Sequence, residues 1–190
     1  MKCYTIIGGV NGTGKSSLLG VLATMVDTGT VIDDTDIEEC LAKNLSFTQE
    51  TTLSGRKTEV TAARAREQGY YVRLYYVGLD TPDECLARIA NRVRRGGHDI
   101  PENDVLRRFE GRWDAVEKIL PYCDEAHFFD NDNGFVEVAE YRNGELQLKG
   151  ERLPAWIAEL SERLKGLRRK RSGQKQRYCS KSTAAQQTMI

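Results

Sequence analysis

The sequence predicts an α/β protein with three layers, in which helices cover both faces of a mostly parallel sheet of five strands. Two observations support this fold class. Short apolar segments typical of buried strands alternate with amphipathic helical segments along most of the 190 residues, and a glycine-rich loop directly follows the first strand. Alternation of this kind favours parallel strands, because each crossover helix returns the chain to the same end of the sheet.

Length and composition exclude several other classes of protein. With 39% apolar and 29% charged residues, the chain is neither collagenous nor of low complexity. Its longest apolar run is far shorter than the roughly 20 residues of a membrane span, and its first residues lack the apolar stretch of a signal peptide. The 5 cysteines are scattered without a C-x-x-C pair, which argues against disulfides and structural zinc. We expect a cytoplasmic protein that does not bind a membrane.

The formal net charge of zero conceals an uneven distribution. Residues 165–190 contain 8 basic and no acidic residues, which leaves 20 basic and 28 acidic residues, a net charge of −8, in residues 1–164. We expect a folded domain over 1–164 and a basic, disordered tail over 165–190, because no helical or strand period continues there after Leu167. A solvated tail is the simpler interpretation, and binding of nucleic acid is the less favoured alternative.

The first half of the domain is expected to contain three strands and three helices. Strands are indicated by runs of β-branched and aromatic residues, and helices by apolar residues at helical spacing. In order, they are a buried strand Tyr4–Gly8, a helix Lys15–Val26, a strand Thr30–Ile32, a short helix Ile37–Asn44, a strand Leu45–Thr48 and an exposed helix Ser54–Gln68.

The second half contains two helix-start signals and one hairpin signal. A capping box with proline at the first helical position begins one helix, and Asn143-Gly144 is a strong hairpin signal. One long helix from Pro101 is expected, because apolar residues continue on one side as far as Leu120. In order, the elements are a strand Tyr70–Val77, a helix from Thr81, the helix from Pro101, a strand Glu125–Asp130, a C-terminal hairpin at residues 135–149 and an amphipathic helix at residues 154–164.

The segment from Gly9 to Ser16 (GVNGTGKS) fits the phosphate-binding pattern G-x-x-x-x-G-K-[ST], and it lies between a strand and a helix. Glycines let successive backbone N–H groups curl around a phosphate, and the helix N-terminus adds partial positive charge. Lys15 can reach the β- and γ-phosphates as a catalytic residue, and the Ser16 hydroxyl can bind Mg²⁺. The candidate ATP-binding residues are Gly9, Asn11, Gly12, Thr13, Gly14, Lys15, Ser16 and Ser17.

The sequence also narrows the class of P-loop protein. It contains no Asn-Lys-x-Asp motif of the kind with which GTPases recognise guanine, and it is shorter than a motor or AAA ATPase. Arginine-rich helices after the fourth strand suggest a kinase, since kinases use arginines to neutralise the charge of the transferring phosphoryl group. We expect an ATP- and Mg²⁺-dependent kinase that acts on a small-molecule hydroxyl.

Five motifs, in the same order along the chain, resemble the zeta toxin family. They are residues 6–16 (IIGGVNGTGKS), 50–55 (ETTLSG), 92–101 (RVRRGGHDIP), 107–109 (RRF) and 130–131 (DN). The family consists of P-loop kinases, best known for phosphorylating UDP-N-acetylglucosamine. The resemblance spans about residues 4–135. It implies ATP and Mg²⁺ as cofactors, a UDP-amino sugar as one acceptor, and an antitoxin protein as a partner.

The resemblance implies roles for residues near the ends of the second and third strands. Glu50 would hold a Mg²⁺-bound water or contact the substrate, and Thr51 and Thr52 would add hydroxyl contacts to the substrate. The family's general base is an aspartate just after the second strand, for which Asp36 is our choice. A helix cap is the alternative role for this aspartate. The other candidate bases are Asp33 and Asp34.

Residues 92–101 resemble the lid of the family. Arg92 or Arg95, together with Arg107 or Arg108, would close on the β- and γ-phosphates. Arg92, Arg107 and Arg108 are therefore our candidate catalytic arginines. The resemblance also suggests that Asp130-Asn131, after the last parallel strand, lies near the adenine.

The sequence departs from the family in one place. Only Ile37–Asn44 connects the aspartates to the third strand, whereas a parallel crossover needs about a dozen residues. The corresponding segment of the family helps to shape the acceptor pocket. Two alternatives therefore stay open: a catalytically impaired nucleotide-binding pseudo-kinase, and a polynucleotide kinase that recruits its substrate through the basic tail.

Overall fold

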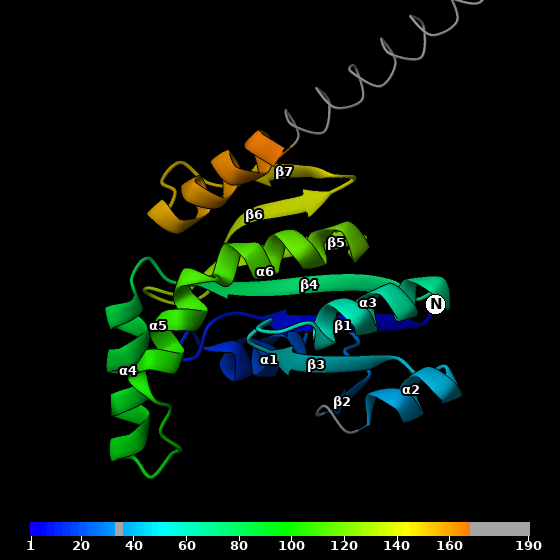
Figure 1. Cartoon of the computed structure of the whole chain (residues 1–190), viewed down its shortest axis with the longest axis horizontal. Coiled ribbons are helices and arrows are strands. Elements are labelled where there is room, and N and C mark those ends of the chain that lie inside the picture. Colours follow the sequence, from blue (N-terminus) through cyan, green and yellow to red (C-terminus); the bar gives the residue numbers. More distant parts are fainter. Residues whose placement is uncertain (33–35, 168–190) are drawn as a thin grey trace, which may run out of the picture.

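The computed structural model describes residues 1–32 and 36–167, and its elements form layers around one sheet (Figure 1). The sheet contains seven strands in the order β2-β3-β1-β4-β5-β6-β7. The strands β1 (Cys3–Gly8), β2 (Thr30–Ile32), β3 (Phe47–Thr51), β4 (Tyr71–Gly78) and β5 (Glu125–Asp130) run parallel. The last two, β6 (Val136–Arg142) and β7 (Glu145–Leu148), are antiparallel. The mixed α/β class is confirmed.

The expected number of five strands is wrong, because the C-terminal hairpin continues the sheet instead of standing apart from it. β6 pairs with β5 from Glu125↔Arg142 to Asp130↔Val136, and β7 pairs with β6. Only residues 131–135 separate β5 from β6. So short a connection reverses the chain beside the strand that it has just left, which produces an antiparallel pair.

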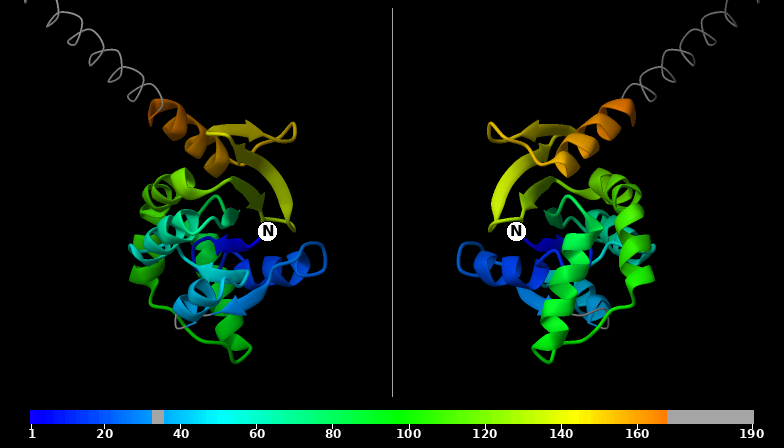
Figure 2. Two further views of the ribbon diagram at one scale, coloured as in Figure 1. Left: turned by 90° about the vertical axis from the view of Figure 1, so that its right-hand side faces the viewer. Right: turned by 90° about the vertical axis from the view of Figure 1, so that its left-hand side faces the viewer.

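Helices cover both faces of the sheet (Figure 2). One face carries α1 (Lys15–Leu22), and the other carries α2 (Ile37–Lys43), α3 (Lys57–Glu67), α6 (Arg112–Ile119) and helical residues 155–167. The helices α4 (Pro82–Arg94) and α5 (Glu102–Glu110) pack beyond the carboxyl ends of β1 and β4 (Figure 1). In the described ranges, no helix has the length and apolar character that crossing a membrane requires.

The expected single helix from Pro101 is wrong, because the chain bends at Gly111 (φ −81°, ψ 3°) and forms α5 and α6, followed by a 3₁₀ turn at Leu120–Tyr122. The apolar pattern runs on through the bend because both helices bury one side. Phe109 of α5 packs in a cluster with Val10, whereas Trp113 of α6 belongs to the main core. A continuous apolar stripe therefore did not distinguish one straight helix from two.

The crossover from β2 to β3 is longer than the sequence indicated. β2 ends at Ile32, and β3 begins at Phe47 instead of Leu45, so residues 33–46 connect the two strands. This segment reaches the length of about a dozen residues that a parallel crossover needs. The strands pair in parallel, with Val31 opposite Thr48, and α2 lies between them in the chain. The segment is therefore long enough for the parallel connection that it makes.

The C-terminal helix completes the core. Trp156, Ile157 and Leu160 are buried, and Trp156 stacks on Trp113 with ring centroids 6.0 Å apart. The indole Nε1 of Trp156 donates a hydrogen bond of 2.8 Å to Asp130 Oδ1 at the end of β5. The expected helix end at residue 164 is wrong, since the helix includes residues 165–167. The remainder of the expected tail, residues 168–190, lies outside the described residues.

Packing of Trp156 against the sheet leads to a stability prediction. A Cβ added at Gly78 of β4 would lie 2.6 Å from Trp156 Cε2, so Gly78→Ala should lower the free energy of unfolding by about 1–3 kcal/mol through overpacking. Gly20 of α1 has no atom within 4 Å of such a Cβ. The matched control Gly20→Ala should therefore raise stability by about 0.5–1 kcal/mol through helix propensity. Urea denaturation measures both, and equal effects of the two changes would contradict this packing.

Candidate functional site

The phosphate-binding loop lies between β1 and α1, at the carboxyl end of the parallel strands. Gly14 is the N-cap of α1, with φ 101°, and Lys15 is its first residue. Gly12 also has a positive φ of 84°, and a Cβ at this position would lie 2.5 Å from the carbonyl oxygen of Cys85 in α4. Only glycine combines this backbone conformation with this approach. The fold therefore holds the loop tightly against α4.

Three side chains hold the loop in place. Thr13 Oγ1 donates to the Val10 carbonyl at 2.9 Å, and Asn131 Nδ2 donates to the Thr13 carbonyl at 2.8 Å. Arg108 Nη1 of α5 donates to Asn11 Oδ1 at 2.6 Å. Residues far away in the sequence, Arg108 and Asn131, thus fix the conformation of the loop. Asn131, which was expected near the adenine, contacts the loop itself, and its neighbour Asp130 accepts the bond from Trp156.

Lys15 is 7% exposed, and its Nζ donates to the Val10 carbonyl at 3.2 Å. Burial lowers the pKa of Lys15 to about 8, although the carboxylate of Glu50 acts in the opposite direction. The guanidinium groups of Arg108 and Arg92 lower this pKa further. A phosphate bound beside this buried lysine would favour its charged form more strongly than Glu50 alone does.

Ser16 and Glu50 meet at the end of the loop. Ser16 Oγ donates to Glu50 Oε2 at 2.7 Å, because β3 pairs with β1 in a register that places Glu50 opposite Ile7. A hydroxyl and a carboxylate oxygen are ligands that Mg²⁺ prefers. The pair faces the same cavity as Lys15, so these residues fit the predicted metal site.

A cavity of about 330 Å³, here called the P-loop cavity, contains these groups. Its walls include Asn11, Gly12, Gly14, Lys15, Ser16, Ser17 and Glu50, together with Arg88 and Arg92 of α4. Arg88 is a functional candidate that the sequence reasoning missed. It lies one helical turn before Arg92, and this i,i+4 spacing was the available signal. Arg88 also donates to the Asn131 carbonyl, so it supports the residue that holds the loop.

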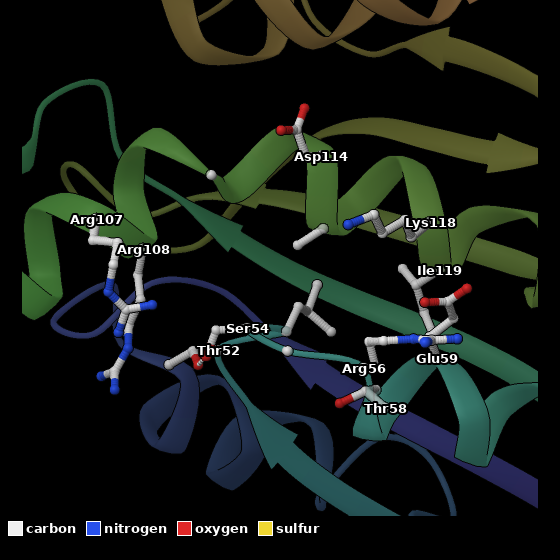
Figure 3. Close-up of a pocket in the computed structure, with 14 residues that line it drawn as sticks. Thr52, Ser54, Arg56, Thr58, Glu59, Arg107, Arg108, Asp114, Lys118 and Ile119 are labelled. Atoms are coloured by element: carbon white, nitrogen blue, oxygen red, sulfur yellow. Dashed lines mark hydrogen bonds between the residues drawn. The ribbon is translucent and has the colours of Figure 1, made fainter.

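Figure 3 shows a second cavity, of about 340 Å³. It is bounded by the loop after β3, the first turn of α3, the end of α5 and one side of α6. Thr52 and Ser54 line it, as do Arg107 and Arg108. Arg108 lines the second cavity and bonds to Asn11, which lines the P-loop cavity. The walls of the two cavities are therefore in contact.

The loop after β3 holds an unusual conformation. Leu53 has a positive φ of 59°, which is unfavourable for a residue with a branched side chain, and its side chain is buried. Thr51 Oγ1 accepts a hydrogen bond of 3.0 Å from the Leu53 backbone, so Thr51 shapes the loop. Thr52, whose hydroxyl lies 2.7 Å from that of Ser54, faces the second cavity. Of the two threonines, only Thr52 is placed to reach a ligand there.

The candidate lid arginines differ in their surroundings. Arg92 lines the P-loop cavity and donates to the His98 carbonyl at 2.8 Å. Arg95 lines an adjoining hollow beside α4, which shares Arg88 and Arg92 with the P-loop cavity. Arg107 is 64% exposed and pairs with Asp104 at 2.8 Å. Arg108 is 23% exposed and touches the P-loop. The structure thus brings Arg92 and Arg108 to the P-loop, and Arg107 only to the second cavity.

Asp36 is the N-cap of α2, beyond the end of β2, and it lines neither cavity. It is exposed, and its side chain makes no capping hydrogen bond. The strand β3 separates β2 from β1 and its P-loop. Asp33 and Asp34 lie outside the described residues. The choice among the three aspartates therefore stays a prediction.

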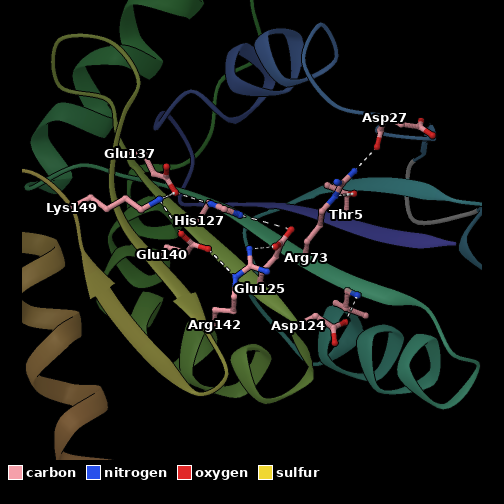
Figure 4. A network of polar contacts seen from close by, with 11 residues as sticks. Thr5, Asp27, Arg73, Asp124, Glu125, His127, Glu137, Glu140, Arg142 and Lys149 are labelled. Carbon is pink, nitrogen blue, oxygen red and sulfur yellow. Dashed lines mark hydrogen bonds and ion pairs between the residues drawn. The ribbon is translucent and has the colours of Figure 1, made fainter. Parts of the chain in front are cut away.

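A further group of potential metal ligands, His127, Glu137 and Glu140, lies on β5 and β6 (Figure 4). Lys149 Nζ is 2.9 Å from Glu137 Oε1 and 3.0 Å from Glu140 Oε2, so an ammonium group already bridges the two carboxylates. Arg142 also pairs with Glu140. The two carboxylates of this group therefore already have basic partners.

Comparison with known proteins supports the fold and leaves the family open. No family model matches the chain. An uncharacterized protein of Haemophilus influenzae is 39% identical over 69 residues, which cover 36% of this chain and 49% of that protein. The chain therefore matches about half the length of this relative.

Solved structures with a similar fold include chains of two systems. A chain of the AvrRxo1-ORF1:AvrRxo1-ORF2 complex with sulphate ions has a TM-score of 0.61 at 17% identity, covering 85% of this chain and 64% of that one. The same complex with ATP gives 0.57 at 17% identity, covering 86% and 63%. A chain of the PezAT chromosomal toxin–antitoxin system of Streptococcus pneumoniae gives 0.54 at 14% identity, covering 87% and 86%. The chain spans less than two thirds of the AvrRxo1 chains, and these likenesses show a shared fold.

The pKa of Lys15 leads to a prediction for nucleotide binding. Below pH 8 the ammonium is already charged, whereas above pH 8 ATP must bind together with a proton, because its phosphates favour the charged lysine. The affinity for ATP should therefore fall by up to about tenfold for each pH unit above 8. Calorimetric titrations from pH 7 to 9.5 measure this slope. Lys15→Arg, which stays charged, should remove the slope, and a flat profile for the unchanged protein would refute the prediction.

Proposed function

We propose that the chain is an ATP-dependent kinase of the zeta toxin type, which transfers the γ-phosphoryl group of ATP to a hydroxyl group of a small molecule. The observation that carries this proposal is the contact between Arg108 and Asn11, which joins a P-loop cavity to a second cavity lined by hydroxyl and basic side chains. A nucleotide site alone would explain the first cavity. A phosphoryl transfer site also needs the second, for the acceptor.

ATP would bind to the P-loop residues, with its phosphates at the backbone N–H groups before α1 and at Lys15. Ser16 and Glu50 would hold Mg²⁺, Glu50 directly or through a water. When bound, Mg²⁺ neutralises phosphate charge and orients the γ-phosphate. The fold shared with an ATP-containing complex is consistent with this nucleotide, which the P-loop itself supports independently.

Catalysis would rest on charge stabilisation and on one proton acceptor. Lys15, Arg92 and Arg108 would stabilise the charge that develops on the transferring group, and Arg107 would contribute from the second cavity. Asp36, or else Asp33 or Asp34, would accept the proton of the attacking hydroxyl. Because Asp36 lines neither cavity, this role requires a rearrangement that brings Asp36 and the attacking hydroxyl together.

The acceptor and the protein partner follow from resemblance. Thr52 would bind the acceptor in the second cavity, Glu50 would face it from the P-loop cavity, and a UDP-amino sugar is the first acceptor to test. The structural neighbours include chains of a toxin–antitoxin system and of a two-protein complex. We therefore propose an antitoxin protein as a partner. The β2–β3 crossover is long enough for a parallel connection, which favours an active kinase over a pseudo-kinase.

The proposed activity is tested by incubating the protein with ATP, Mg²⁺ and a panel of nucleotide sugars and detecting products by mass spectrometry. Lys15→Ala should lower product formation by about 10²–10³-fold, since it removes one charge that stabilises the transition state. Lys43→Ala, which removes an exposed lysine paired with Glu39, is the matched control and should retain activity. Equal product from Lys15→Ala and the unchanged protein would exclude the proposed mechanism.

A comparison of neighbouring arginines tests the connection between the cavities. Arg108→Ala should reduce kcat by about 10²-fold or more, because this side chain is held against the P-loop. Arg107→Ala should reduce kcat by less than about tenfold, because its side chain is 64% exposed and makes no contact with the P-loop in the described residues, although both arginines pair with Asp104. Steady-state kinetics with the best acceptor of the panel measures both. The opposite order would assign the catalytic role to Arg107 and contradict the geometry proposed here.

A further inference from the structure

We infer that Trp156, in the C-terminal helix of residues 155–167, is a positioning residue for the nucleotide. Through Asp130 it fixes the turn that holds the P-loop, and it thereby raises the affinity for ATP. The inference rests on the proposed function, since it takes ATP as the ligand of the P-loop. It goes beyond that function, because Trp156 lines neither the P-loop cavity nor the second cavity. The C-terminal helix thus takes part in nucleotide binding from outside the site.

Trp156 joins the ends of two parallel strands. Its backbone N–H donates to Oδ1 of Asp80, just after β4, at 2.9 Å. Its indole Nε1 donates to Oδ1 of Asp130, the last residue of β5, at 2.8 Å. Gly78 and Asp130 are opposite each other in the β4–β5 pair, and a Cβ at Gly78 would collide with the indole ring. The buried indole is therefore held in one place against both strand ends.

Asp130 begins a turn that is fixed at several points. Its second carboxylate oxygen, Oδ2, accepts from the Asp132 backbone N–H at 3.2 Å, so each oxygen of this carboxylate has a donor. Arg88 of α4 donates to the backbone carbonyls of Asn131 and Asp132. The turn of residues 130–132 is therefore tied to the C-terminal helix through Trp156 and to α4 through Arg88.

Asn131 is the residue of this turn that reaches the P-loop. Its Nδ2 donates to the Thr13 carbonyl at 2.8 Å, and a Cβ at Gly14, the N-cap of α1, would collide with the same nitrogen. The side-chain amide thus fits closely beside the loop, and a shift of the turn would displace it. Since the backbone N–H groups of a P-loop must point toward the phosphates together, a loop that loses this contact should bind ATP more weakly.

Trp113 provides a matched control. It stacks on Trp156 and is buried to the same extent, with 1% of each residue exposed. Within residues 1–32 and 36–167, however, Trp113 Nε1 has no hydrogen-bond partner. Replacement by phenylalanine removes an N–H group and part of a ring at either position. Only at Trp156 does it also remove a bond to Asp130.

The first test measures the Kd of the full chain for a non-hydrolysable ATP analogue, β,γ-imido-ATP, with Mg²⁺. Trp156→Phe should raise this Kd about 3–10-fold, and Trp113→Phe by less than about twofold, because only the former removes a hydrogen bond to a charged group. Asp130→Ala should also raise the Kd. Adding Trp156→Phe to Asp130→Ala should raise it no further, because the two residues act through one bond.

The second test needs no variant that might fail to fold. Coupling between two sites is reciprocal, so binding of the analogue must also strengthen the bond between Trp156 and Asp130. The chain contains 2 tryptophans, whose indole N–H signals are followed by NMR. Saturation with β,γ-imido-ATP should slow hydrogen exchange at Trp156 Nε1 about threefold or more beyond any slowing at Trp113 Nε1. A general gain in stability would slow both alike.

Two results would overturn the inference and leave the proposed function standing. One is a folded Trp156→Phe protein that binds the analogue as tightly as the unchanged protein does. The other is an equal gain in protection at the two indoles, which decides the matter alone if Trp156→Phe does not fold. Failure of the unchanged protein to bind the analogue would instead refute the proposed function, and the inference with it. The first titration therefore distinguishes the two failures.

Discussion

The register of β1 between β3 and β4 is the constraint on which both cavities depend. It places Glu50 opposite Ile7 and Tyr76 opposite Gly8, so the carboxyl ends of three parallel strands stop at one edge of the sheet. The P-loop leaves β1 there, and the loop after β3 leaves beside it. A slip of one residue would turn Glu50 to the other face of the sheet, and the contact with Ser16 would be lost. Strand pairing therefore positions the chemistry.

The phosphate-binding loop is held by the same packing that joins α4 and α5 to the sheet. Val10 of the loop shares a small apolar cluster with residues of α4 and α5, among them Cys85 and Phe109. Because this cluster packs α4 and α5 against the loop, Arg92 lines the P-loop cavity and Arg108 bonds to Asn11. Their charges and the burial of Lys15 act together, since each lowers the pKa of the lysine. The site therefore favours an anion electrostatically.

Much of this arrangement could be predicted from the sequence, because its signals are local. The P-loop pattern and the capping box at Thr81, which the structure contains, depend only on adjacent residues. Two features could not be predicted because they depend on tertiary structure. The hairpin extends the sheet because β6 pairs with β5. The bend at Gly111 leaves no signal in the sequence, because the apolar stripe continues through it. The choice between Arg107 and Arg108 likewise needed the fold, since neighbouring residues on a helix point in different directions. Asp36, selected by resemblance, lies at neither cavity.

The central claim is that the P-loop cavity and the second cavity form one phosphoryl transfer site joined by Arg108. A crystal structure of the protein with a non-hydrolysable ATP analogue and Mg²⁺ tests it most directly. We expect the γ-phosphate between Lys15 and Arg108, with its free oxygens open to the cavity that Thr52 lines. A γ-phosphate directed toward the hollow beside Arg95, with Arg108 still bound to Asn11, would contradict the claim, because no acceptor in the second cavity could then reach it.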